Sequence, residues 1–157
     1  LDVGTIYKLP VPSIETNVGL VIKNLIEPQF DFPSTDEKLT FQRQLTLGVS
    51  SKLYKVLTLA VDYDLNKTKT LVDGYDIQNF SVGLEINPPI LPVLRLGYLK
   101  NLAMDNDQLY TIGLGIKILV LNFDLVCAFN TQETKINKDL TLPTNNLSLG
   151  ITLGMKF

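Results

Sequence analysis

The chain has 157 residues and a formal net charge of −2; hydrophobic residues make up 45% of it and charged residues 19%. This length fits one domain, and a charge so close to zero gives no electrostatic reason to expect nucleic acid as a partner. The chain has one cysteine and no histidine, which excludes an internal disulfide, a histidine-containing zinc site and a Ser-His-Asp triad.

Apolar and polar residues alternate along most of the chain, which is the pattern of β-strands with one apolar face. In chain order, the alternation predicts nine strands, over residues 1–9, 17–26, 43–53, 56–65, 78–87, 93–102, 109–118, 120–130 and 146–157. A tilted strand needs about 9–11 residues to cross a bilayer, and most segments have that length. No run of about 18 apolar residues is present, so a transmembrane helix is not expected. We therefore expect a single all-β domain over residues 1–157.

Short and long connections alternate between these segments. The short ones cover residues 10–16, 54–55, 88–92 and 119, and the long ones cover 27–42, 66–77, 103–108 and 131–145. All eight prolines fall in these connections, as expected because proline cannot donate to a strand ladder. Short periplasmic turns and longer external loops are typical of outer-membrane barrels. Asp105, Asn106 and Asp107 suit a plain turn better than a calcium site, because their spacing is not that of an EF-hand.

Each predicted strand has an apolar face and a face of polar residues and glycine. In the last strand, Leu149, Ile151 and Leu153 oppose Gly150 and Thr152. Seven charged residues fall on the polar face: Lys52, Asp62, Asp64, Glu85, Arg95, Lys117 and Asp124. The same face carries nine of the ten glycines: Gly4, Gly19, Gly48, Gly83, Gly97, Gly113, Gly115, Gly150 and Gly154.

Glycine weakens a strand that faces solvent, whereas small residues suit the crowded inner wall of a closed barrel. We therefore expect the polar face to line a lumen and the apolar face to contact lipid, as in an antiparallel up-and-down transmembrane β-barrel. A soluble sandwich or barrel, with its apolar face inward, is the alternative.

Aromatic residues on the apolar face fall near the strand ends. If the short connections are periplasmic, two girdles result at the two bilayer interfaces. The external girdle would contain Tyr63, Phe80, Tyr98, Tyr110 and Phe129, and the periplasmic girdle Tyr7, Tyr54 and Phe157.

Several motifs resemble known outer-membrane proteins. The segment 147–157 alternates up to a final aromatic, Phe157, which in such proteins is read by the barrel-assembly machinery. Residues 57–65, 93–98 and 109–115, with 1–4 and 19–25, resemble strands of the TraF-like outer-membrane proteins, described as conjugal transfer proteins and related to PorV and FadL-like barrels. The resemblance implies a bacterial outer-membrane location and a barrel of about 14 strands, with no catalytic residues to carry over.

The strand count leads to a related expectation. If the last of nine strands ends in the periplasm, the first runs inward from outside, whereas bacterial barrels have an even number of strands. We expect these nine to be the C-terminal strands of a larger barrel, and the N-terminal strands to come from the same or another polypeptide, because an open edge in lipid is not tolerated.

No catalytic centre, cofactor or metal site is expected. The inward carboxylates Asp62, Asp64, Glu85 and Asp124 suit lumen lining better than a paired-acid catalytic site. Arg95 is the expected partner of Glu85, because a short turn joins their strands. Cys127 lies on the apolar face and is expected to be a small apolar residue rather than a reactive thiol.

Three functions remain open. The first is a transport or channel barrel for small or hydrophobic solutes. The second is a structural barrel of a secretion, conjugation or other envelope machine. The third is a soluble β-barrel that binds a ligand.

Overall fold

The computed structural model describes residues 1–12, 14–31, 38–70, 72, 74–118, 120–137 and 140–155. Nine strands form one antiparallel sheet. They are β1 (Val3–Leu9), β2 (Ile14–Lys23), β5 (Gln44–Leu53), β6 (Leu57–Asp64), β9 (Asn79–Ile86), β10 (Val93–Asn101), β11 (Gln108–Ile118), β12 (Leu121–Asn137) and β13 (Leu140–Met155). Two small hairpins accompany them, β3 (Gln29–Asp31) with β4 (Lys38–Thr40), and β7 (Thr68–Lys69) with β8 (Asp76–Ile77).

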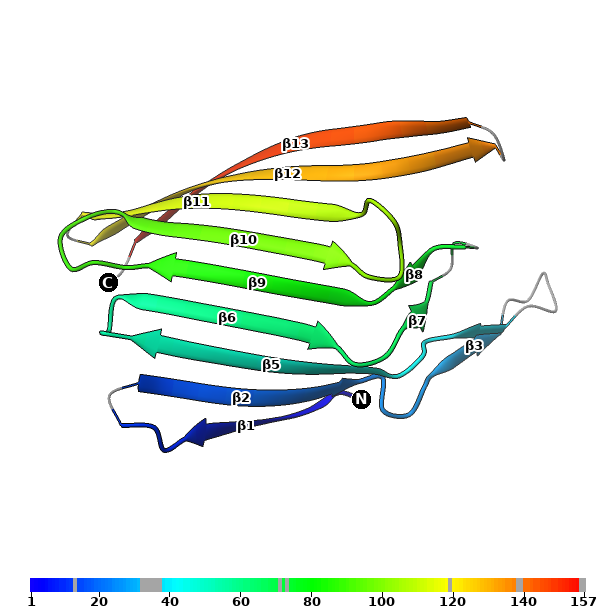
Figure 1. Ribbon diagram of the computed structural model, residues 1–157, viewed down its shortest axis with the longest axis horizontal. Helices are drawn as coiled ribbons and strands as arrows, with labels where there is room; N and C mark the ends of the chain where they lie inside the picture. The colour runs from blue at the N-terminus through cyan, green and yellow to red at the C-terminus, as the bar shows by residue number, and fades with distance from the viewer. Residues whose placement is uncertain are drawn as a thin grey trace.

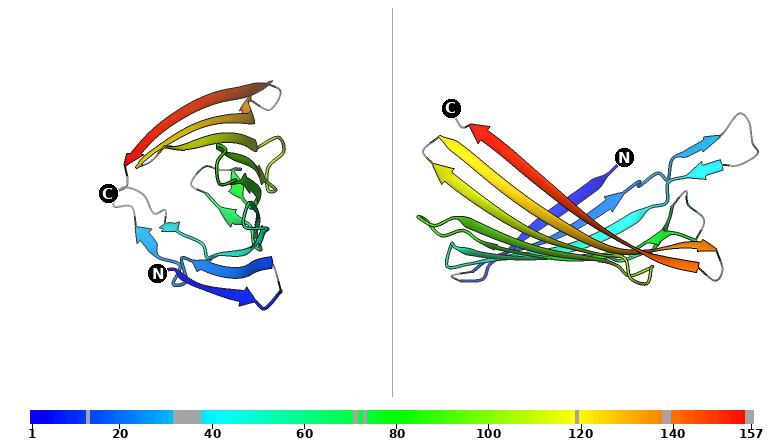
Figure 2. Two further views of the ribbon diagram at one scale, coloured as in Figure 1. Left: turned by 90° about the vertical axis from the view of Figure 1, so that its left-hand side faces the viewer. Right: turned by 90° about the horizontal axis from the view of Figure 1, so that it is seen from above.

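The large sheet follows the order of the chain without a crossover: β1-β2-β5-β6-β9-β10-β11-β12-β13. Each strand therefore lies beside the large-sheet strands that precede and follow it (Figure 1). The sheet curves strongly into an open trough (Figure 2). Within the described residues, β1 and β13 are edges and do not pair with each other.

The expected all-β, antiparallel architecture is confirmed, and all nine predicted strands are present in the predicted order. The expectation of a long loop over 131–145 is wrong, because β12 continues to Asn137 and β13 begins at Leu140. Pro143, which we expected between strands, pairs with Glu133 inside this ribbon. β13 is an edge strand, where proline is tolerated because one side of the backbone needs no partner. The β3–β4 and β7–β8 hairpins inside the other long connections were not expected.

For the described residues, the register places the two faces of each strand as the alternation indicated. Residues paired across strands point to the same side of a sheet. Arg95, for example, pairs with Glu85 and Gly113, and Gly113 pairs with Val126. One face therefore carries the seven predicted charges and the nine predicted glycines, and the other carries the apolar stripe.

Little hydrophobic surface is buried within the sheet. Among the described residues, Val93 is the single buried hydrophobic side chain, and it lies on the polar face beside Gly115. On the apolar face, Ile112 of the interior strand β11 is 51% exposed and Ile151 of the edge strand β13 is 69% exposed. The apolar face thus has no packing partner within the described chain. No helix in the described residues has the length and apolar character to span a membrane.

Candidate functional site

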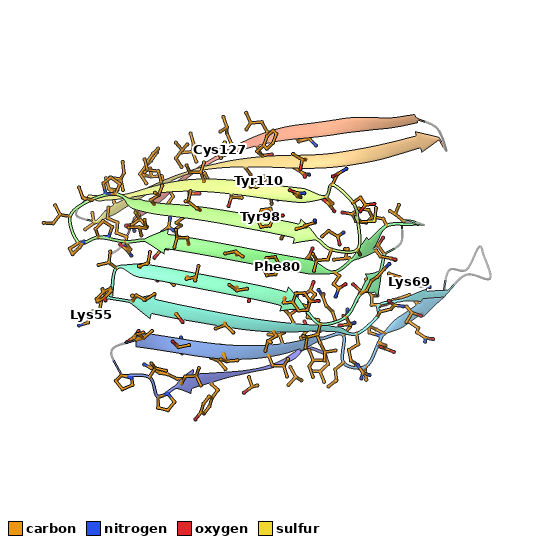
Figure 3. The ribbon with its side chains drawn as sticks, viewed as in Figure 1. Lys55, Lys69, Phe80, Tyr98, Tyr110 and Cys127 are labelled. Carbon is orange, nitrogen blue, oxygen red and sulfur yellow. The ribbon has the colours of Figure 1, made fainter. Side chains whose placement is uncertain are left out.

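Figure 3 looks onto the convex side of the sheet, where the labelled Phe80, Tyr98, Tyr110 and Cys127 lie. The polar face is therefore the concave one, and it forms the wall of the trough. The charged residues of this wall are the candidate site. The buried side chains of Val93, Asp64 and Asn101 all belong to this face.

Arg95 is the centre of the charged wall. Its Nε donates to Glu85 Oε2 at 2.9 Å, which confirms the expected pair, and its Nη1 donates to Asp124 Oδ1 at 2.8 Å. Glu85 is on the neighbouring strand β9, whereas Asp124 is on β12, with β11 in between. The guanidinium therefore joins carboxylates from both sides, and the three side chains are between about a third and a half exposed to the trough.

Two glycines of β11 make the bond between Arg95 and Asp124 possible. A Cβ added at Gly115 would lie 2.7 Å from Asp124 Oδ1 and 3.2 Å from Arg95 Nη1. A Cβ added at Gly113 would lie 3.4 Å from the Cβ of Arg95. The absence of side chains at these positions gives the arginine a path over the strand. Arg95 and Asp124 therefore lie close against β11.

Asp64 is held by hydrogen bonds at the end of β6 where the long connections lie. Its carboxylate accepts from Gln44 Nε2 at 2.8 Å, from Thr46 Oγ1 at 2.7 Å and from the backbone N–H of Asn79 at 2.8 Å. The residue is 3% exposed. It lies on the polar face as expected, but it joins three neighbouring strands instead of presenting a free charge.

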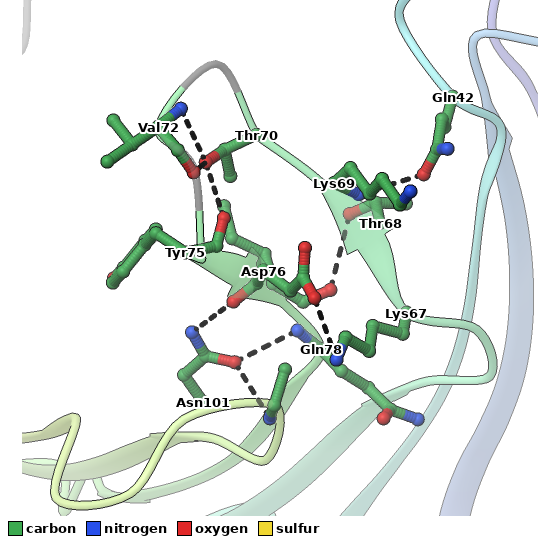
Figure 4. A network of polar contacts seen from close by, with 12 residues as sticks. Gln42, Lys67, Thr68, Lys69, Thr70, Val72, Tyr75, Asp76, Gln78 and Asn101 are labelled. Atoms are coloured by element: carbon green, nitrogen blue, oxygen red, sulfur yellow. Dashed lines mark hydrogen bonds and ion pairs between the residues drawn. The ribbon is translucent and has the colours of Figure 1, made fainter.

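A second polar network fixes the β7–β8 hairpin to β10 (Figure 4). Asn101, 2% exposed, donates to the carbonyl of Asp76 at 2.8 Å and to Asp107 Oδ2 at 3.2 Å. Its own side-chain oxygen accepts the backbone N–H of Gln78 at 3.0 Å and of Ala103 at 3.1 Å. The hairpin turns toward the concave side of the sheet (Figure 2). Sequence reasoning missed Asn101, because an asparagine at a strand end ordinarily indicates only a turn.

Tyr75 adds a titratable contact to the same network. Its hydroxyl donates to Asp107 Oδ2 at 2.6 Å. This hydrogen bond, together with burial and the negative charge of Asp107, raises the pKa of Tyr75 above its ordinary value of 10.0, while a hydrogen bond with Asn101 acts in the opposite direction. Asp107 ends the turn that contains Asn106, whose φ of 58° is left-handed.

The remaining predicted wall residues lie on the expected face without joining the Arg95 cluster. Asp62 lies against Gly48, where a Cβ would meet its carboxylate. Lys52 pairs across the strands with Glu15 and Thr58, and Lys117 with Asn122. The described residues contain no group of three or more histidine, cysteine, aspartate or glutamate side chains able to hold a metal ion.

The predicted external aromatics are brought together. Tyr63 pairs with Phe80, and Tyr110 pairs with Tyr98 on one side and Phe129 on the other. The rings of Tyr98 and Tyr110 have centroids 5.1 Å apart. Tyr7 is on the same face and Tyr54 is in the turn between β5 and β6, whereas Phe157, also expected to be the assembly signal, lies outside the described residues. The height of these rings relative to a bilayer stays a prediction.

Comparison with known protein families gives a match over part of the chain. Residues 1–64 match the family model described as "F plasmid transfer operon, TraF, protein", which agrees in part with the resemblance drawn from the sequence. No curated protein and no solved structure matches the chain.

Proposed function

We propose that the chain forms part of the wall of a transmembrane β-barrel in a bacterial outer membrane, through which small or hydrophobic solutes pass or in which they bind. The observation that carries the proposal is the exposure of the apolar face on interior strands, as at Ile112 and Leu96, which are 51% and 42% exposed. Burying a Leu or Ile side chain is worth about 1.5–3 kcal/mol. A face with this many exposed apolar side chains is stabilised by contact with an apolar environment, and the acyl chains of a membrane provide one.

The opposite face supports the same assignment. Its glycines and its paired charges fit a narrow lumen, where space is limited and water solvates the wall. The Arg95 cluster would set the local charge of that lumen, and such charges tune selectivity. This is a non-enzymatic role for Glu85 and Asp124, which leaves neither as a free acid or base.

Closure requires strands beyond the nine. A barrel in lipid cannot leave the backbone groups of β1 and β13 unpaired, and both are edges within the described residues. We propose that further strands, from the same or another polypeptide, close the wall, and that the barrel-assembly machinery inserts it. Membrane lipid is then the main partner of the convex face.

Reconstitution tests the transport role. The protein, purified in detergent, should give stepwise ion conductance in planar bilayers, and it should need detergent for extraction from membranes. Release by salt or alkaline carbonate without detergent would support the soluble binder instead. Full membrane integration without conductance or solute uptake would reject transport and retain the barrel.

The family match favours one second candidate, a structural barrel of a conjugation or other envelope machine. The matched residues 1–64 cover β1 to β6 and the β3–β4 hairpin. If this role holds, a cross-linker attached in one of the long connections should link the chain to other envelope proteins in intact cells. A barrel that conducts but captures no protein partner would count against it.

A further inference from the structure

We propose that a hollow in the concave wall binds a small organic cation of the primary alkylammonium class. The hollow has a volume of about 240 Å³ and lies over β1, β2, β5 and β6, the first four strands of the large sheet (Figure 1). At about 30 Å³ for each water-sized group, it holds a ligand of roughly eight non-hydrogen atoms. The site does not depend on the membrane assignment, because the hollow lies on the concave face whatever covers the convex one.

Two glycines form the floor of the hollow. Ile6, Gly19, Gly48 and Asp62 pair in one row across the four strands. A Cβ added at Gly19 would lie 3.6 Å from the side chain of Ile6, and a Cβ added at Gly48 would meet the carboxylate of Asp62. The two side chains therefore lie over the glycines from opposite sides, which gives the hollow an apolar end and an acidic end.

The acidic end carries a charge that the described chain does not neutralise. Among the residues that the structure describes, the carboxylate of Asp62 has no hydrogen-bond or ion-pair partner. The two carboxylates of the Arg95 cluster, by contrast, share a guanidinium. Lys8 of β1 lies 3.9 Å from Glu15, between Nζ and Oε1, and does not line the hollow. An ammonium group beside Asp62 would gain a charge-assisted hydrogen bond.

Neutral oxygen atoms lie next to this carboxylate. Asn17 and Ser50 pair with each other across β2 and β5, and both line the hollow. Within the described part of the chain, neither side chain forms a hydrogen bond, so the oxygens of both remain available to a ligand. A primary ammonium group has three N–H donors. Asp62 and these two oxygens supply three acceptors for them.

The apolar end selects an organic cation rather than a metal ion. Ile6 and Val21 line the hollow and are 77% and 37% exposed on the concave face. A hydrocarbon tail would cover both side chains, whereas a hydrated metal ion would not. Calcium and magnesium sites also use several oxygen ligands, often from more than one carboxylate, and the described residues contain no acidic cluster suited to a metal.

Calorimetric titration of the full chain in a nonionic detergent tests the site. Hexylammonium is the probe, and hexan-1-ol is its neutral counterpart of the same length. Titration of each compound into detergent alone corrects for partition into micelles. We expect hexylammonium to bind at least about tenfold more tightly than hexan-1-ol, which equals about 1.4 kcal/mol.

Three variants separate the parts of the site. Asp62→Asn keeps the size of the side chain and should weaken hexylammonium binding about tenfold. Asp105→Asn, the matched control, removes an equal charge from the β10–β11 turn and should leave binding unchanged. Ile6→Ala alters an exposed side chain and should not impair folding. In the unaltered chain, affinity should increase from ethylammonium to hexylammonium, and Ile6→Ala should reduce this increase.

Four results would overturn the proposal. The first is the absence of saturable binding of hexylammonium. The second is equal affinity for hexylammonium and hexan-1-ol, which would leave an apolar hollow without a role for charge; this comparison on the unaltered chain decides alone if Asp62→Asn does not fold. The third is an equal loss in Asp62→Asn and Asp105→Asn, which would reduce the attraction to net charge. The fourth is tighter binding of a lysine-containing peptide, which would assign the hollow to a protein side chain.

Discussion

Arg95 on β10 reaches Asp124 on β12 across the whole width of β11, with 2.8 Å between Nη1 and Oδ1. The bond passes over Gly115, where a Cβ would lie 2.7 Å from the carboxylate oxygen. The spacing of these two charges is thus set by a residue that has no side chain.

The glycine requirement predicts a stability difference between two alanine variants on the same face. Gly115→Ala should lower the free energy of unfolding by about 1–3 kcal/mol, the usual cost of overpacking. Gly83→Ala is the control, because a Cβ there meets nothing within 4 Å; it should be neutral or stabilising by up to about 1 kcal/mol. Urea unfolding in one detergent measures both. Equal midpoints would contradict the role given to Gly115.

The Arg95 cluster predicts a change of ion selectivity. In the proposed channel, Arg95→Gln would leave Glu85 and Asp124 without their cation, so the concave wall would become more negative and conductance should become more cation-selective. Reversal potentials in a salt gradient measure this shift. Lys100→Gln removes an equal charge from the convex face, where Lys100 pairs across strands with Phe80, and should not change the reversal potential. A shift of the same size in both variants would reject the wall assignment.

The lipid-facing assignment predicts opposite tolerance of arginine on the two faces. Ile112→Arg, on the convex face in the middle of β11, should destabilise the bilayer-inserted protein by about 2–4 kcal/mol. Ala60→Arg, on the concave face beside Gly83, should be tolerated, because Gly83 leaves open space there. Unfolding from phospholipid vesicles provides the measurement. In a soluble protein with an unpartnered outer face, Ile112→Arg would instead improve solubility and leave stability unchanged.

The Asn101 network predicts how firmly the β7–β8 hairpin is held. Asn101→Ala would leave the buried groups that bond to it without partners, at a cost of about 1–3 kcal/mol. Trypsin should then cut faster at Lys67, just before the hairpin, and at Lys69, within it. Asn87→Ala, at the other end of β9, removes a single 3.5 Å contact with Glu85 and should leave the cleavage rate unchanged.

The Tyr75–Asp107 contact predicts a pH dependence at the same place. The folded-state pKa of Tyr75 lies above its ordinary value, so the contact stabilises the docked hairpin in full below the unfolded pKa of about 10. The stabilisation is lost as the pH rises through the folded-state pKa. Tryptic cleavage at Lys67 and Lys69, normalised to a peptide substrate, should therefore accelerate above pH of about 10. Tyr75→Phe should remove this acceleration; an unchanged pH profile would contradict it.

The alternation of the sequence was sufficient to locate every strand of the large sheet and both of its faces. Successive side chains of a strand point to opposite faces of the sheet, so the pairing of neighbouring strands decides which side chains share a face. Glu85 and Arg95, which pair across β9 and β10, are an example. The Glu85–Arg95 pair was therefore predictable, because one short turn joins its strands. Asp124 as the second partner was not, because it lies two strands away and depends on the empty space above Gly115.

The ends of the sheet were harder to predict. Polar composition and Pro143 indicated a loop over 131–145, but β12 and β13 stay paired through most of this range. The network of Tyr75, Asn101 and Asp107 joins residues from two connections and one strand end. Isolated polar residues of this kind form no repeating pattern in the sequence, so their hydrogen-bond partners can be identified only from the three-dimensional structure.

A sheet without crossovers also bears on how the protein is assembled. Each strand of the large sheet pairs only with those nearest to it in the chain, so loop-closure costs are small and the wall can grow one hairpin at a time. Low contact order of this kind favours rapid folding. It also means that the outermost strand at either end can be removed, or another added, without breaking the pairs among the remaining strands, so evolution can change the width of such a sheet by adding or deleting strands at its ends.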